Sequence, residues 1–78
     1  MGHHQLKILP SHMNAVVQGA KRFEVRDNSD RGFQAGDTFE LLEWEEGRYS
    51  SRIFPGVITY VTNFEQRPNW VVFGFIER

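Results

Sequence analysis

The pattern of hydrophobic and polar positions predicts a short strand followed by a short helix at the start of the chain. Gln5-Leu6-Lys7-Ile8 alternates polar and apolar residues, which is typical of a strand with one buried face. Pro10 ends this strand and fits the first turn of a helix. Apolar residues then recur at helical spacing between positions 13 and 17, and Gly19 stands where a left-handed cap is expected. We expect about two helical turns between Pro10 and Gly19.

The segment from Arg22 to Arg26 predicts a strand with one apolar and one charged face. Phe23 and Val25 alternate with Arg22, Glu24 and Arg26. Because successive side chains point to opposite faces of a strand, the apolar pair can pack in the core while the charged residues are presented on the other face. We expect this strand to display the chemistry of the protein.

The rest of the chain alternates between turn formers and β-branched or aromatic runs. Turns are expected at 27–32, 35–37 and 46–47, a strand break at Pro55-Gly56, and a polar loop at 63–69. Strands are expected at 38–45, 49–53, 57–62 and 70–76. Between the first two turns, Phe33 is expected to fill the core.

Short, mostly antiparallel strands with a single helix after the first favour a small barrel that closes its own edges. The chain has 78 residues, without linker, repeat or low-complexity tract, whereas a domain usually has roughly 100 to 200 residues. We therefore expect one domain over residues 1–78, of mainly β class with one or two short helices, folded as a small β-barrel.

The absence of cysteine and of long apolar runs restricts the class of protein. Without Cys no disulfide framework or thiolate metal site can form, and a chain held together by packing alone suits a reducing cytoplasm. No apolar run approaches the ~20 residues needed to span a bilayer. His3, His4 and His12 have no Asp or Cys at ligand spacing. We expect a cytoplasmic protein without metal, cofactor or membrane partner.

Charge is balanced overall but uneven along the chain. The formal net charge is −1, which argues against binding nucleic acid through bulk positive charge. Residues 1–35 nevertheless carry five bases and three acids, while 36–47 carry five acids and no base. One face can therefore be locally positive.

The stretch from Gly19 to Arg26 contains the most informative cluster. After the predicted helix cap, Lys21 begins the strand, and the period of two places Glu24 and Arg26 on one face. A cation, an anion and a cation close together can hold a phosphate or a polar base edge, or can shift a pKa for proton transfer. The alternative is a surface ladder of ion pairs that stabilises a strand.

This cluster and the segments around it resemble the ASCH domain, a branch of the PUA-like superfamily, and in particular its small stand-alone bacterial and phage members. The resemblance begins with Gly-x-Lys-x-x-Glu-x-Arg at 19–26 and extends in order over nearly the whole chain. The other matching segments are His4-Gln5-Leu6-Lys7, Asn28-Ser29-Asp30-Arg31-Gly32-Phe33, Gly36-Asp37, Leu42-Glu43-Trp44, Tyr49-Ser50-Ser51-Arg52, Ile58-Thr59-Tyr60-Val61 and Val71-Val72-Phe73-Gly74.

The resemblance implies a PUA-like β-barrel with a cleft into which Lys21, Glu24 and Arg26 point, in a superfamily whose members bind RNA or act on nucleotides. Some similar small proteins are amidohydrolases that remove an acyl group from the exocyclic amine of cytidine, with a Thr proposed as nucleophile beside a Lys. Lys21 matches that Lys, but Glu24 stands where the Thr would be. Ser29 is an insertion, and Ser50-Ser51 replaces Thr-Gly, so the neighbouring loops are expected to differ.

The sequence therefore predicts a module that binds RNA or a nucleotide-like ligand, with Lys21 and Arg26 contacting phosphate and Glu24 accepting from a base amino group. The first alternative is an amidohydrolase on acylated cytidine-type nucleosides, in which Lys21 and Glu24 are the candidate catalytic residues and Glu24 is a general base. The second alternative is an accessory module that binds a protein partner. The remaining candidate ligand-binding residues are His4, Lys7, Arg31 and Arg52, with Trp44, Tyr49 and Trp70 as stacking surfaces or rim packing.

Overall fold

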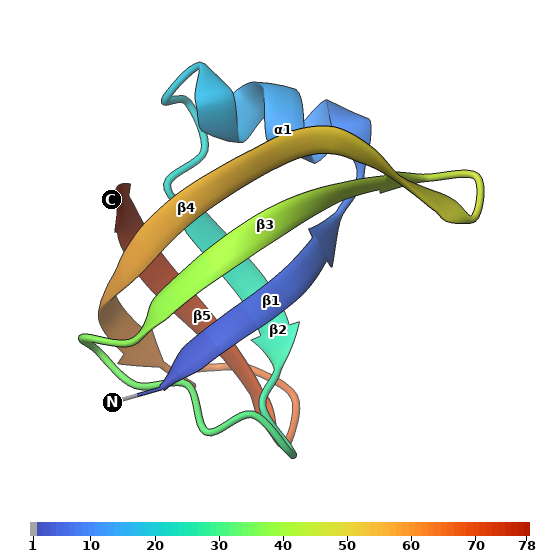
Figure 1. The fold of residues 1–78 in the computed structure, drawn as a ribbon. Helices are drawn as coiled ribbons and strands as arrows, with labels where there is room; N and C mark the ends of the chain where they lie inside the picture. The colour runs from blue at the N-terminus through green and yellow to red at the C-terminus, as the bar shows by residue number, and fades with distance from the viewer. Residues whose placement is uncertain (1) are drawn as a thin grey trace.

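The computed structural model describes residues 2–78; position 1, which the domain prediction includes, lies outside the described residues. Five strands and one short helix make a mainly β structure (Figure 1). In chain order the elements are β1 (His3–Ile8), α1 (Pro10–Val17), β2 (Phe23–Asp27), β3 (Thr38–Glu45), β4 (Arg48–Thr62) and β5 (Trp70–Glu77).

The strands form one sheet in the order β1-β3-β4-β5-β2. The β1–β3 pair is parallel, and the other three pairs are antiparallel. Strong curvature makes the sheet a half-barrel, as Figure 1 shows. The prediction that the barrel closes its own edges is not met, because no ladder between β1 and β2 is formed within residues 2–78. Two strand edges are therefore left without strand partners, and they flank a gap in the barrel.

The concave face of the sheet encloses an aromatic core. Phe39 contacts Phe73 and Phe75 edge to face, and Phe33 from the loop before β3 packs on Phe73. Phe33 is 4% exposed, which confirms that it fills the core. Such ring pairs favour a tilted or edge-to-face arrangement, and large rings supply most of the apolar area that so small a domain can bury. The buried core residues are Leu6, Ile8, Met13, Val16, Phe33, Phe39, Leu41, Phe54, Ile58, Val71, Phe73 and Phe75.

The helix begins and ends where the apolar pattern predicts. Pro10 occupies its first turn, and Gly19 follows its C-cap with φ of +80°. Such a left-handed residue ends a helix and redirects the chain. Met13 and Val16 face the core, so α1 covers one end of the half-barrel. Within the described part of the chain, no helix is long and apolar enough to cross a membrane.

The predicted break at Pro55-Gly56 is wrong, because β4 continues through it as one strand of fifteen residues. The backbone N and O of a residue point to the same side of a strand, and the Pro55 carbonyl accepts from the N–H of Arg78, just beyond the end of β5. The Pro55 nitrogen therefore points toward the end of β5 as well. The ladder ends there, so the N–H that proline lacks is not required. By contrast, the predicted turn at Glu46-Gly47 is confirmed, with φ of +51° and +83°.

The faces of β2 are the reverse of those predicted from its apolar residues. Phe23 and Val25 are 48% and 45% exposed, whereas Glu24 is 3% exposed. The register explains the reversal, because Glu24 pairs with Phe73 and therefore shares the concave face with it. Glu24 and Arg26 therefore face the interior of the half-barrel, whereas Asp27 at the end of the strand is exposed.

Gly56 is required by the close approach of Phe39 to β4. A Cβ built at Gly56 would overlap the Phe39 ring, which is fully buried. Gly56→Ala is therefore expected to lower the free energy of unfolding by about 1–3 kcal/mol, as overpacked cores do. Urea denaturation measures this change in the free energy of unfolding. Gly74→Ala in β5 is the matched control, because its Cβ would meet only ordinary contacts at 3.6 and 3.8 Å. Equal stabilities of the two variants would contradict the packing argument.

Candidate functional site

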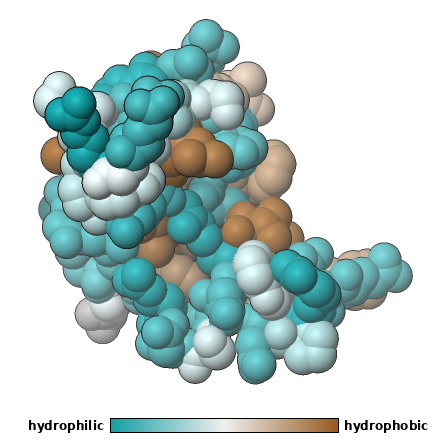
Figure 2. All heavy atoms as spheres, turned by 90° about the vertical axis from the view of Figure 1, so that its right-hand side faces the viewer, coloured by the Kyte–Doolittle hydropathy of each residue, from teal (hydrophilic) through white to brown (hydrophobic). Residues whose placement is uncertain are grey.

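A cavity of about 870 Å³ opens between the unpaired edges of β1 and β2; it is called the cleft below. Leu6–Leu9 form one wall and Phe23–Asp27 the other. Residues 29–31 lie at the mouth, and His12 of α1 also lines the cleft. Figure 2 shows apolar surface on this side of the molecule bordered by hydrophilic side chains. The cleft thus combines apolar side chains with a larger number of charged and polar ones, and small-molecule sites likewise use polar groups to orient a ligand on an apolar lining.

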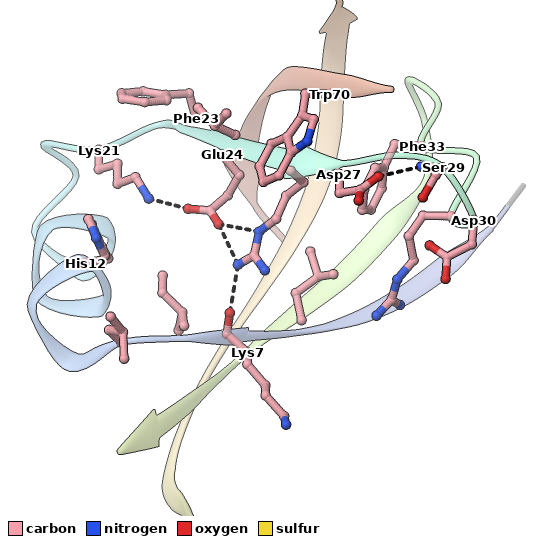
Figure 3. Close-up of a pocket in the computed structure, with 16 residues that line it drawn as sticks. Lys7, His12, Lys21, Phe23, Glu24, Asp27, Ser29, Asp30, Phe33 and Trp70 are labelled. Carbon is pink, nitrogen blue, oxygen red and sulfur yellow. Dashed lines mark hydrogen bonds and ion pairs between the residues drawn. The ribbon is translucent and has the colours of Figure 1, made fainter. Parts of the chain in front are cut away.

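Glu24 lies between two cations in the wall of the cleft (Figure 3). Its Oε2 accepts a hydrogen bond from Lys21 Nζ, which also forms an ion pair. Its Oε1 accepts from Arg26 Nε at 2.9 Å and from Arg26 Nη2 at 2.7 Å. The structure thus brings together the three residues that the Gly-x-Lys-x-x-Glu-x-Arg segment predicts.

The cluster of Lys21, Glu24 and Arg26 contains two cations and one carboxylate, so its net charge is +1. A buried carboxylate is costly unless it is paired and hydrogen-bonded, and here two cations satisfy it. The side chains of Lys21 and Arg26 remain 17% and 24% exposed, respectively. Each has further N–H groups beyond those bonded to Glu24. An anionic or carbonyl-bearing ligand in the cleft would find donors already held in place.

Arg26 also joins the two open edges of the half-barrel. Its Nη2 donates to the backbone carbonyl of Lys7 in β1 at 2.7 Å. This side-chain bond links β1 to β2, which no ladder connects. In Figure 3 the Lys7 carbonyl points toward the guanidinium while the Lys7 side chain points away from the cleft.

The loop after β2 is shaped by two side chains that accept backbone hydrogen bonds. Asp27 Oδ1 accepts from the Ser29 N–H at 2.8 Å, and Asn28 Oδ1 accepts from the Phe33 N–H at 2.8 Å. The backbone hydrogen bond from Ser29 lowers the pKa of Asp27, and the Ser29 side chain adds to the effect. These bonds hold the loop that presents Arg31 at the mouth of the cleft.

Two aromatic side chains line the cleft wall on the β2 side. Phe23 is 48% exposed, and Trp70 lies at the start of β5, opposite Asp27 in the register. Arg67 covers one face of the Trp70 ring at 4.3 Å from its centroid. Exposed rings beside polar groups offer surfaces on which a planar ligand can stack.

His4, a predicted ligand-binding residue, does not line the cleft. Its ring is buried, its Nε2 lies 2.8 Å from Asp37 Oδ2, and it packs on Phe33. Asp37 also accepts from the N–H groups of Gly2 and Gln34, at 2.8 and 3.1 Å. Sequence reasoning missed this network because Asp37 stands in a Gly-Asp turn, where an exposed carboxylate is the usual expectation.

Arg52 lies outside the cleft as well. It pairs with Glu43 and donates to Asn14 Oδ1 of α1 at 2.6 Å, which ties β4 to the helix. The hydrogen bond from Arg52, with a second from Ser50, lowers the pKa of Glu43.

Trp44 and Tyr49 stand opposite each other in the β3–β4 hairpin, with their rings edge to face. Lys7 Nζ lies 4.0 Å from the centroid of the Trp44 ring. These three predicted residues therefore lie together, but on the convex side of β1, away from Glu24. The sequence did not single out Phe23, Asp27 or Asp30 as lining residues, and the predicted turn at 27–32 pointed only to the two Asp residues.

Within residues 2–78, no group of three His, Cys, Asp or Glu side chains is placed to hold a metal ion. Four cations and three carboxylates line the cleft, and the N–H groups of Lys21 and Arg26 that Glu24 does not use suit an anion or a carbonyl oxygen.

A family model described as a domain of unknown function, DUF3850, matches residues 3–75. The chain belongs to the DUF3850 family. The match includes the whole of β1 and β2 and therefore both walls of the cleft.

The chain is also similar to a protein of Escherichia phage P2, described as an uncharacterized 12.9 kDa protein in the GpA 3′ region. The two are 37% identical over 60 residues, which cover 77% of this chain. The chain spans about half, 54%, of the length of that relative. The family to which the chain belongs is therefore related to a phage protein.

The buried His4–Asp37 pair predicts an acid-sensitive stability. Burial would raise the pKa of Asp37, but hydrogen bonds from His4, Gly2 and Gln34 outweigh it and hold the pKa below the usual 3.8. Because the folded pKa is the lower one, the stabilisation is complete above the unfolded-state pKa and is lost as the pH falls through the folded pKa. Asp37→Asn is expected to cost about 1–3 kcal/mol at pH 7, since buried donors lose their charged acceptor.

Urea denaturation between pH 7 and pH 3 tests this prediction. The difference in unfolding free energy between wild type and Asp37→Asn should shrink below about pH 4. Asp30→Asn, at an exposed position of the loop, is the control and should follow the wild-type pH dependence. A difference between wild type and Asp37→Asn that stays constant over this range would show that the Asp37 carboxylate is not the acid-sensitive group.

Proposed function

We propose that this domain binds a nucleotide, free or as part of an RNA, in the cleft, and that its half-barrel is a PUA-like fold of the ASCH type. The observation that carries the proposal is the buried Glu24 clasped by Lys21 and Arg26 in the wall of a solvent-open cavity. A strand that needed only stability would place apolar residues on its core face. Here the apolar Phe23 and Val25 lie on the exposed face of β2 instead, where they border the cleft.

The size of the cleft fits a ligand of this class. Its volume of about 870 Å³ falls within the roughly 300–1,000 Å³ that is usual for small-molecule sites. Lys21 and Arg26 supply donors for a phosphate or a base carbonyl, and Glu24 has lone pairs left to accept from a base amino group. Phe23 and Trp70 add ring surface for stacking.

Hydrolysis of an acylated cytidine-type nucleoside is the competing hypothesis. Glu24 stands where the similar amidohydrolases are proposed to have a Thr nucleophile, so turnover would require Glu24 to take the proton of an attacking water instead. General base catalysis requires a base within hydrogen-bond reach of that proton. The arrangement therefore favours binding over turnover. A protein-binding role is the second alternative, in which ligand chemistry in the cleft would be irrelevant.

A thermal-shift screen tests the proposal. The panel contains nucleosides, N4-acylated cytidine, nucleoside monophosphates and short single-stranded RNAs. At one hundred times its Kd, a ligand stabilises the native state by about 2.7 kcal/mol, which raises Tm by about 10 °C or more in a domain of this size. Lys21→Met is expected to weaken binding by about tenfold or more, because a charge-assisted hydrogen bond is lost.

Arg52→Met is the matched control. It also removes a cation from a carboxylate, here Glu43, but it lies outside the cleft and should leave the ligand shift unchanged. Release of acetate and cytidine from N4-acetylcytidine would replace the binding proposal with the hydrolytic one. The absence of any shift across the panel would overturn both and leave a protein partner as the leading hypothesis.

A further inference from the structure

A second hollow, of about 430 Å³, adjoins the cleft on the convex side of β1; it is called the outer hollow below. It shares Leu6, Lys7, Arg26 and Arg31 with the cleft. Its remaining lining residues are Gln5, Leu42 and Tyr49. The two cavities therefore adjoin each other at the open edge of β1, where no strand pairs.

The position of Lys7 defines the outer hollow. The burial of β1 alternates, so Leu6 and Ile8 face the core while Gln5 and Lys7 face out. Lys7 pairs in register with Leu42 of β3, which shares the outer face. In Figure 3 its side chain points away from Glu24, although its carbonyl binds Arg26. Lys7 thus contributes to the cleft through its backbone and to the outer hollow through its ammonium group.

The outer hollow is lined by three cations and no carboxylate. Arg26 is paired with Glu24, but within residues 2–78 no carboxylate lies within salt-bridge distance of Lys7 or Arg31. Glu40 lies on the same outer face of β3, but it accepts a hydrogen bond from Gln5 rather than pairing with Lys7 or Arg31. Two uncompensated cations beside a hollow favour an anion, and single-stranded nucleic acid offers a phosphate at every residue.

An exposed aromatic ring borders these cations. Tyr49 is 51% exposed, and Lys7 Nζ lies 5.9 Å from its ring centroid. Trp44 packs edge to face on Tyr49 and fixes its ring. Sites for single-stranded nucleic acid combine a cationic path for the backbone with rings on which bases stack. The β3–β4 hairpin, which extends beyond the rest of the sheet in Figure 1, supplies that ring here.

We infer that the outer hollow is a second nucleotide subsite, so that the ligand is single-stranded RNA that crosses the open edge of β1. This inference rests on the proposed function of the cleft. One nucleotide occupies the cleft beside Lys21, Glu24 and Arg26. The adjoining phosphate contacts Lys7 and Arg31, and the next base stacks on Tyr49.

The experiment compares short and long ligands in wild type, in the double variant Lys7→Gln with Arg31→Gln, and in Lys21→Met. The probes are the four nucleoside 5′-monophosphates, followed by fluorescein-labelled RNA pentamers of A, C and U measured by fluorescence anisotropy at 50–200 mM salt. Both substituted side chains of the double variant are exposed, so its Tm should equal that of wild type.

The double variant is expected to bind the pentamer about tenfold or more weakly and to lose less affinity for the monophosphate, which reaches only the cleft. The slope of log K against log salt should fall by about 1.4, since two phosphate contacts at about 0.7 each are lost. The double variant Arg48→Gln with Arg52→Gln removes the same amount of charge, here from the β3–β4 hairpin and outside the lining of both cavities. It should leave pentamer binding unchanged.

Three results would overturn the second subsite while leaving the cleft intact. They are a pentamer that binds no tighter than the monophosphate, a Lys7/Arg31 variant that binds the pentamer like wild type, and equal losses in both double variants. In each of these cases Lys21→Met still binds the monophosphate more weakly than wild type does. If neither probe binds wild type, or if Lys21→Met binds both as wild type does, the proposed function itself fails and the subsite falls with it.

Discussion

The burial of one carboxylate governs the local architecture of this domain. Glu24 lies on the concave face of β2, beside Phe73 in the aromatic core, where an unpaired charge would be costly. Lys21 and Arg26 satisfy it, and Arg26 reaches on to the Lys7 carbonyl across the gap. A single guanidinium thus neutralises the buried charge and connects two strand edges that share no ladder. This arrangement leaves a cleft where ladder bonds would otherwise close the barrel.

The unclosed edge has consequences on both faces of β1. On the inner side, donors and apolar walls surround the cleft. On the outer side, Lys7 and Arg31 flank a hollow that ends at Tyr49. Since a sheet edge with unpaired backbone groups invites unwanted pairing, the Arg26 bond and the helix at one end of the half-barrel also limit exposure of that edge. The same opening therefore accounts for the cleft and for the outer hollow that adjoins it.

Outside the cleft, one close contact and one buried hydrogen-bond network hold the strands in position. Phe39 lies against Gly56, so β4 needs a residue without Cβ at that position. His4 and Asp37 join the start of β1 to the loop before β3 through a buried network. Both features position the strands that carry the cleft, although neither lines it.

The sequence by itself determined the helix, the β3–β4 hairpin and the grouping of Lys21, Glu24 and Arg26. Each depends on contacts between residues close in the chain: helical spacing, a turn with two residues of positive φ, and the period of two in a strand. The tertiary structure decided which face of β2 is buried, because that follows from pairing with β5 rather than from the apolar residues of β2 itself. It also decided that β4 continues through Pro55, because β5 ends beside it, and that His4 pairs with Asp37, thirty-three positions away. Local patterns contain no information about such distant partners, and burial at these positions depends on them.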